Sequence, residues 1–231
     1  MQHEVLHGPS HSMLKVKLEP GEKFIAEAGT MVTHTDGVKM EAKLNAGSKA
    51  GCLGLIFAIF IAFIRKIIGG DSFFVSHFSP PAGGGEVTIA PSLNGSIEHR
   101  SLAQGEKLMM TAGAYLASTP GVNLEIKWGG CSGILAKEGA FFMEASGPGE
   151  LWFNSYGGIY PVEVNGTYVV DNGHIVAFDS GMKYTLKKAG KGLLGSMASG
   201  EGLVCEFQGQ GTVYLQSRNV GALVEWLTRI S

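Results

Sequence analysis

The chain has 231 residues, with 35 glycines, 45% apolar residues and only 16% charged residues. This composition excludes a disordered chain and indicates many tight turns, because glycine in a helix interior costs about 1 kcal/mol relative to alanine. The net charge of −2 excludes the long-range attraction that basic proteins exert on nucleic acid or acidic membranes.

The opening residues, MQHEVLHGPSHSM, carry neither a secretory signal pattern nor an Arg-rich amphipathic presequence. The three cysteines, Cys52, Cys131 and Cys205, form no C-x-x-C pair, which argues against a disulfide framework. We therefore expect a cytoplasmic protein, or a mitochondrial one if the source is eukaryotic, although no presequence is visible.

Alternation of apolar and polar residues predicts the first strands. It runs through Met13–Leu18 and again from Val38 to Leu44, as in strands with one buried face. Gly21, Gly29 and Gly37 stand eight residues apart and predict the intervening turns.

The segment from Cys52 to Gly70 is apolar on every face between Leu53 and Ile64. It is shorter than the roughly 20 residues of a transmembrane helix. It could pack under the protein's own sheets, against another subunit, or on a membrane surface. Burial in the protein or its oligomer is favoured, since no wider basic patch accompanies it. The expected contact residues are Leu55, Ile56, Ile59, Phe60, Phe63, Ile64, Arg65 and Lys66.

The glycine pattern recurs twice further along the chain. The segments that begin at Leu18, Leu102 and Val162 align without a gap, so that Gly29, Gly113 and Gly173 correspond. Apolar runs near residues 73–75, 141–143 and 203–205 also correspond, as do residues 86–89, 150–153 and 212–215. We therefore expect three tandem repeats, of about 4–91, 96–157 and 158–219, in one compact body of residues 1–231.

The smaller signals complete this picture. The dipeptides Asn94-Gly95 and Asn165-Gly166 predict turns, because Asn-Gly accepts positive φ at both central hairpin positions. Ala222–Leu227, after the last repeat, is expected to form a short helix.

The run SHSMLKVKLEPGEKFIAEAGTMV, the run GDSFFVSHF and the glycine turn before EVTIA resemble the family named for altered inheritance of mitochondria. That family is similar in fold to the tryptophan RNA-binding attenuation protein (TRAP). The resemblance covers about Glu4 to Asn219. It implies a β-sandwich or double-stranded β-helix that forms oligomers, and links eukaryotic members to mitochondrial inner-membrane organisation. It supplies no catalytic residues, and the attenuator's ligand sites are not transferred.

Candidate chemistry is weak throughout. His3, His7 and His11 would share a helix face and suggest a metal, but Gly8-Pro9 interrupts that helix. His34, His77, His99 and His174 stand alone, and no nucleophile elbow or phosphate loop is present. The lysines at 187, 188 and 191 could contact phosphates, but a solvated face is the simpler interpretation. We expect no metal and no cofactor.

The sequence thus predicts an all-β protein of three tandem β-sandwich or double-stranded β-helix repeats around a pseudo-threefold axis, with a short apolar helical connector in the first repeat. We expect a non-enzymatic scaffold or assembly protein that forms a homo-oligomer through this connector, or meets a peripheral membrane or protein partner there. Nucleic acid is not an expected partner of this scaffold. Alternatives are a small-molecule or nucleic-acid binding module of TRAP-like fold and a metal-dependent enzyme on a cupin-like barrel.

Overall fold

The computed structural model describes residues 1–44, 74–111, 113–128, 141–188 and 203–230. Most of these residues form strands, and the one α-helix among them is α3 (Val220–Ile230). The predicted all-β class and the predicted terminal helix are therefore confirmed. The apolar connector Cys52–Gly70 lies outside the described residues.

The strands fall into three consecutive units behind an opening strand, β1 (Gln2–Leu6). The first unit comprises β2 (Met13–Leu18), β3 (Phe24–Glu27), β4 (Met31–His34), β5 (Lys39–Leu44), β6 (Phe74–Ser79) and β7 (Gly85–Ile89). The second unit comprises β8 (Ile97–Leu102), β9 (Lys107–Thr111), β10 (Tyr115–Ser118), β11 (Asn123–Trp128), β12 (Phe141–Ser146) and β13 (Gly149–Asn154). The third unit comprises β14 (Ile159–Asp171), β15 (Ile175–Asp179), β16 (Lys183–Lys188) and β17 (Leu203–Gln216).

Pairing follows one order in all three units. In the first unit, β2-β7-β4 form one sheet and β5-β6-β3 form the other. In the second unit, β8-β13-β10 and β11-β12-β9 repeat this order. In the third unit, the two halves of β14 and of β17 take the places of separate strands, with β15 and β16 beside β17.

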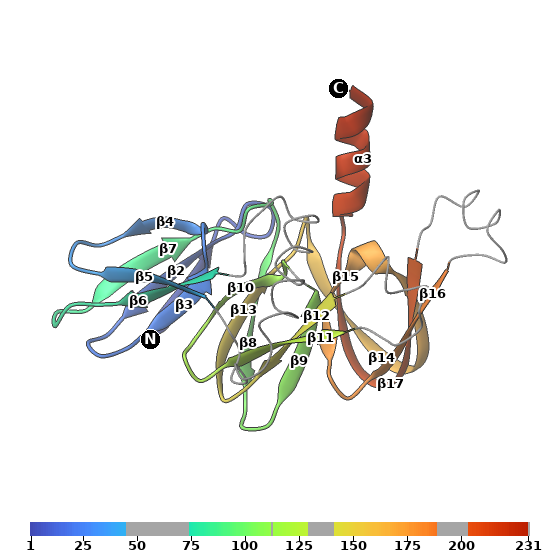
Figure 1. Cartoon of the computed structure of the whole chain (residues 1–231), viewed down its shortest axis with the longest axis horizontal. Helices are drawn as coiled ribbons and strands as arrows, with labels where there is room; N and C mark the ends of the chain where they lie inside the picture. Colours follow the sequence, from blue (N-terminus) through green and yellow to red (C-terminus); the bar gives the residue numbers. More distant parts are fainter. Residues whose placement is uncertain (45–73, 112, 129–140, 189–202, 231) are drawn as a thin grey trace.

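Neighbouring units share sheets. β3 of the first unit pairs with β10 of the second, and β9 of the second unit pairs with β15 of the third. The result is sheets of four, six and seven strands, and Figure 1 shows the three units side by side along the long axis of the molecule. The expected pseudo-threefold axis and the repeat bounds stay predictions.

Three apolar clusters fill the spaces between the sheets. The first unit's cluster contains Leu14, Val16 and Phe24, which are fully buried because β2 and β3 turn alternate side chains inward. The second cluster centres on Leu108, Tyr115 and Phe153, and the third centres on Phe178, Phe207 and Val213. The clusters contain residues from more than one unit. Leu116, Ala117 and Trp152 of the second unit belong to the first cluster.

Two glycine positions explain the turns between second and third strands. Gly29 and Gly113 have φ values of 87° and 97°, a left-handed conformation in which a side chain would be strained. The turn predicted at Asn165-Gly166 is wrong, because both residues lie inside β14. There Gly166 pairs with Gly209, and this glycine pair with φ values of 114° and 118° lets both strands continue.

Candidate functional site

The contact residues predicted in the connector all lie outside the described residues: Leu55, Ile56, Ile59, Phe60, Phe63, Ile64, Arg65 and Lys66. Cys52 and Cys131 lie there too. The third cysteine, Cys205, is buried in β17, and burial raises the pKa of its thiol to about 12. A thiol that stays protonated at neutral pH is not a nucleophile.

Two of the seven histidines meet at the junction of the first and second units. The rings of His3 and His99 lie 4.4 Å apart between centroids, and both contact Trp152. His99 Nε2 lies 2.6 Å from a carboxylate oxygen of Glu150. Burial and then the neighbouring His99 lower the pKa of His3, against the opposite pull of Glu150. Across the described ranges, no three His, Cys, Asp or Glu residues are placed to hold a metal ion.

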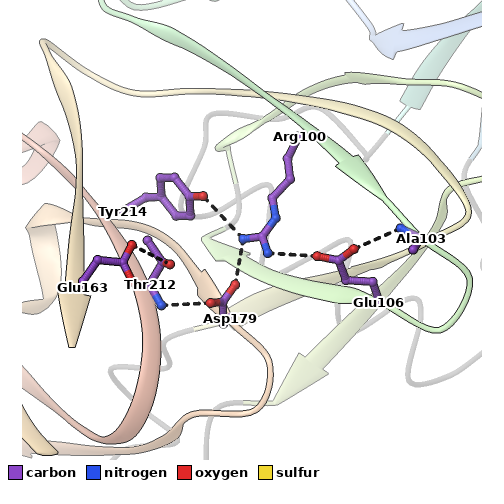
Figure 2. Close-up of polar contacts among 7 residues, drawn as sticks. All are labelled: Arg100, Ala103, Glu106, Glu163, Asp179, Thr212 and Tyr214. Atoms are coloured by element: carbon purple, nitrogen blue, oxygen red, sulfur yellow. Dashed lines mark hydrogen bonds and ion pairs between the residues drawn. The ribbon is translucent and has the colours of Figure 1, made fainter. Parts of the chain in front are cut away.

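A network of ion pairs joins the second and third units (Figure 2). Arg100 on β8 donates from Nη1 to Asp179 Oδ1 at 2.7 Å and from Nη2 to Glu106 Oε1 at 2.9 Å. Its Nη1 also lies 3.4 Å from the hydroxyl of Tyr214 on β17. The guanidinium therefore connects a turn of its own unit to two strands of the next unit.

The carboxylates of this network are held by backbone groups as well. Glu106 Oε2 accepts from the N–H of Ala103, and Asp179 Oδ2 accepts from the N–H of Thr212. The backbone bond and then Arg100 lower the pKa of Glu106. Burial alone would lower the pKa of Arg100, but its bonds to Asp179 and Glu106 raise it above the usual value. Because both carboxylates bond to this guanidinium, its role is structural: Arg100 links the second unit to the third.

One half-buried carboxyl group has a near-neutral pKa. Burial raises the pKa of Glu27, on β3, to about 7. Its charge also helps, after burial, to raise the pKa of Tyr115, whose hydroxyl lies 3.0 Å from Ser118 Oγ. Perturbed groups of this kind mark active sites and also tightly packed interiors. Tyr115 is fully buried between the units, so the packing role fits this position.

Glu27→Gln is expected to stabilise the protein more at pH 8 than at pH 5. The folded-state pKa exceeds the unfolded one, so wild-type stability is full below about pH 4.5 and declines as pH rises towards 7. The variant lacks this decline, and the gain at pH 8 over pH 5 should be on the order of 1–3 kcal/mol. Denaturant unfolding of both proteins at the two pH values measures it. An equal difference at both pH values would contradict the half-buried carboxyl.

The lysine cluster does not form an open phosphate site in the described part. Lys187 is paired with Glu206 at 2.7 Å, and the side chain of Lys188 and all of Lys191 lie outside the described residues. The backbone N–H of His11 donates to the carbonyl of His7, but neither residue belongs to a group placed to hold a metal ion among the described residues. His174 bonds through Nδ1 to the carbonyl of Gln216.

Helix α3 presents an apolar stripe to solvent. Val220, Val224 and Leu227 lie on one helical face and are 39%, 53% and 51% exposed. Trp226 lies about 100° around the helix from Leu227, outside the stripe, and is 59% exposed. The side chain of Asn219 caps the helix by accepting from the N–H groups of Gly221 and Ala222. Figure 1 shows α3 standing away from the sheets.

The two end strands of the row are exposed as well. Every residue of β4 is exposed, including Met31 at 38% and Val32 at 48%. At the other end, Tyr168 and Val169 in the second half of β14 are 36% and 54% exposed. Other exposed large apolar residues of the described structure are Val5, Met40, Phe74 and Tyr160, so α3 and these two strand edges carry part of the exposed apolar surface.

The family model for mitochondrial biogenesis AIM24 matches residues 3–218 of the chain. The chain belongs to this family. The family resemblance in the sequence is therefore confirmed, whereas the TRAP-like fold stays a prediction.

Two streptococcal proteins are also similar to this chain. An uncharacterised protein of Streptococcus pyogenes serotype M6 is 31% identical over 221 residues, which cover 94% of this chain and 86% of the relative. A crystal structure of a Streptococcus pyogenes protein from a structural genomics consortium matches with a TM-score of 0.77 at 28% identity. That match covers 100% of this chain and 99% of the other. In this AIM24-family chain, none of the helices described is long and apolar enough to cross a membrane.

Proposed function

We propose that this AIM24-family protein is a non-enzymatic scaffold that assembles into homo-oligomers. The observation that carries the proposal is the exposed apolar stripe of α3. An isolated helix of 11 residues is marginal in water and needs a packed apolar face for stability. Val220, Val224 and Leu227 form such a face, and nothing described on their own chain covers it well enough to bury them.

The charges of α3 favour a protein partner over a lipid surface. Membrane-surface helices carry several Lys and Arg residues on their polar face. Here Arg229 is the basic residue of the helix, and it is paired with Glu225 at 2.6 Å. A second copy of the chain presents an identical apolar stripe, so two helices can cover each other.

The apolar connector is the second contact in this proposal. Residues 53–64 are apolar throughout and are too short to span a bilayer. Of the contacts that the sequence leaves open, this proposal takes the one with another subunit or a protein partner. The binding-module alternative stays a prediction, and no observation among the described residues favours it.

Solution mass tests the two contacts separately. The full chain is expected to sediment as an oligomer, and a Val224→Lys, Leu227→Lys variant is expected to shift towards monomer. Ala222→Lys adds a single lysine on the opposite side of the helix and should leave the mass unchanged. Deletion of residues 53–64 tests the connector in the same way.

A liposome flotation assay separates the membrane outcome. A monomeric full chain that floats with vesicles only when residues 53–64 are present would contradict the scaffold proposal. A full chain that is monomeric and does not float would contradict it too.

A further inference from the structure

The two internal junctions follow one rule. In each, the second strand of one unit pairs antiparallel with the third strand of the next unit: β3 with β10, and β9 with β15. The register is the same in both when the aligned positions are compared. Ala26 is opposite Ala117 and Ile25 is opposite Ser118, while Met110 is opposite Ala177 and Met109 is opposite Phe178.

Third strands share a further feature. The register of each against its own sixth strand shifts at the same place, between Met31 and Thr33, between Tyr115 and Ala117, and between Ile175 and Ala177. The shifted strand carries a pair of residues into the preceding unit's cluster, Leu116 and Ala117 in one case. Val176 and Ala177 do the same in the other case. Val32 and Thr33 hold these positions in β4.

Burial at the two ends of the row departs from this rule. All residues of β10, and all but the last residue of β15, are buried, whereas all four residues of β4 are exposed. The second strands show the same difference. Ile25 of β3 is half-buried and Met109 of β9 is buried, whereas Val169, at the aligned position of β14, is 54% exposed. Among the described residues no unit stands before the first or after the third, so one third strand and one second strand are left open.

We propose that β4 of one copy pairs antiparallel with the second half of β14 of another copy, head to tail. The internal register assigns His34 opposite Val169 and Thr33 opposite Val170. This contact rests on the proposed self-assembly and names surfaces that the connector and α3 do not supply. Figure 1 shows β4 and β14 in the units at opposite ends of the row, so one chain offers both surfaces to two neighbours.

Other strand edges do not carry the same argument. β5, β11 and β16 are the fourth strands of their units, and within the described residues each pairs only with its fifth strand. Their outer edges are therefore open in every unit alike. β1 covers the outer edge of β2, whereas the equivalent edges of β8 and of the first half of β14 are open, so that difference comes from an added strand and not from a neighbouring unit. Of the edges that neighbouring units close in the described structure, only the edge of β4 and that of the second half of β14 are open. Because β4 and β14 differ, the contact is heterologous, and it gives rings if the rotation closes and filaments if it does not.

Cysteine pairing between two variants tests the register. In a chain with Cys52→Ser and Cys131→Ser, one sample carries His34→Cys and the other carries Val169→Cys, both at exposed positions. Directly opposite residues have Cβ atoms about 4.5–5.5 Å apart, close to disulfide range. Oxidation of the mixture should therefore form a mixed dimer at least about tenfold faster than either variant alone pairs with itself.

The control replaces His34→Cys by Lys39→Cys on the open edge of β5. This pair should cross-link no faster than the single variants. A double His34→Cys, Val169→Cys chain should give a ladder or a closed ring. Faster pairing of either variant with itself, or equal rates in the control mixture, would overturn the head-to-tail contact.

Solution mass separates this inference from the proposed function. If the wild-type chain is oligomeric but the His34→Cys and Val169→Cys variants form no mixed disulfide, the strand contact is contradicted and the scaffold proposal is not. A wild-type chain that stays monomeric at all concentrations contradicts both the strand contact and the scaffold proposal. Val169→Lys, which places a charge on the open edge, should weaken the association by at least about tenfold, because charged edge residues block strand pairing.

Discussion

Arg100→Met is expected to lower the free energy of unfolding by about 2–4 kcal/mol, because removing one partner of a largely buried ion pair leaves the other charges uncompensated. The side chain of Arg100 is 24% exposed and bonds to Asp179 and Glu106 at once. Methionine keeps most of the volume, so the change isolates the charge and its hydrogen bonds. Denaturant unfolding followed by circular dichroism measures the loss.

A double-mutant cycle with Asp179→Asn assigns the effect to the contact between units. We expect a coupling of about 1–3 kcal/mol, in the range for residues in one ion-pair network. Lys15→Ala breaks a more exposed pair with Glu86 and should change stability by less than about 1 kcal/mol. Coupling near zero would show that Arg100 does not hold the second and third units together.

Trp152→Ala is expected to be the most destabilising substitution, at about 3–5 kcal/mol for a fully buried aromatic side chain. Trp152 belongs to the second unit but lies in the first unit's cluster, with its ring 5.8 Å from that of Phe24. Removal of the Trp152 ring therefore leaves a cavity and also weakens the contact between the first and second units. Thermal and denaturant unfolding both report it.

Two variants separate the causes. The buried Trp152 Nε1 has no hydrogen-bond partner within the described structure. Trp152→Phe keeps an aromatic ring and removes this polar atom, so it should cost much less than alanine. Trp226→Ala on the exposed face of α3 should fall within about 0.5 kcal/mol of wild type. A Phe variant as unstable as the Ala variant would contradict the packing role.

The strands with one wet face could be predicted from the sequence. Met13–Leu18 was expected as a strand and is β2 with the same bounds, because Lys15 and Lys17 alternate with buried residues. Tyr115–Ser118 could not be found in this way. All four of its residues are buried, since neighbouring units cover both faces, and a strand of this kind has no alternation.

Contacts between units could not be predicted from the sequence, for a different reason. Arg100 and Asp179 stand 79 residues apart, and only the pairing of β9 with β15 brings them together. The aligned positions gave no hint either, because Val16 corresponds to Arg100 and Thr119 to Asp179. His3 and His99 meet in the same way across the first junction, although the sequence grouped His3 with His7 and His11 and left His99 alone.

The sharing of apolar clusters between units bears on how such a chain could arise by duplication. Leu116, Ala117 and Trp152 complete the first unit's cluster, so a solitary unit would leave that cluster open to water. A one-unit ancestor would therefore have needed neighbouring copies before gene fusion joined them. Fusion or loss of whole units keeps each junction intact, whereas a break between β9 and β10 would uncover two clusters at once.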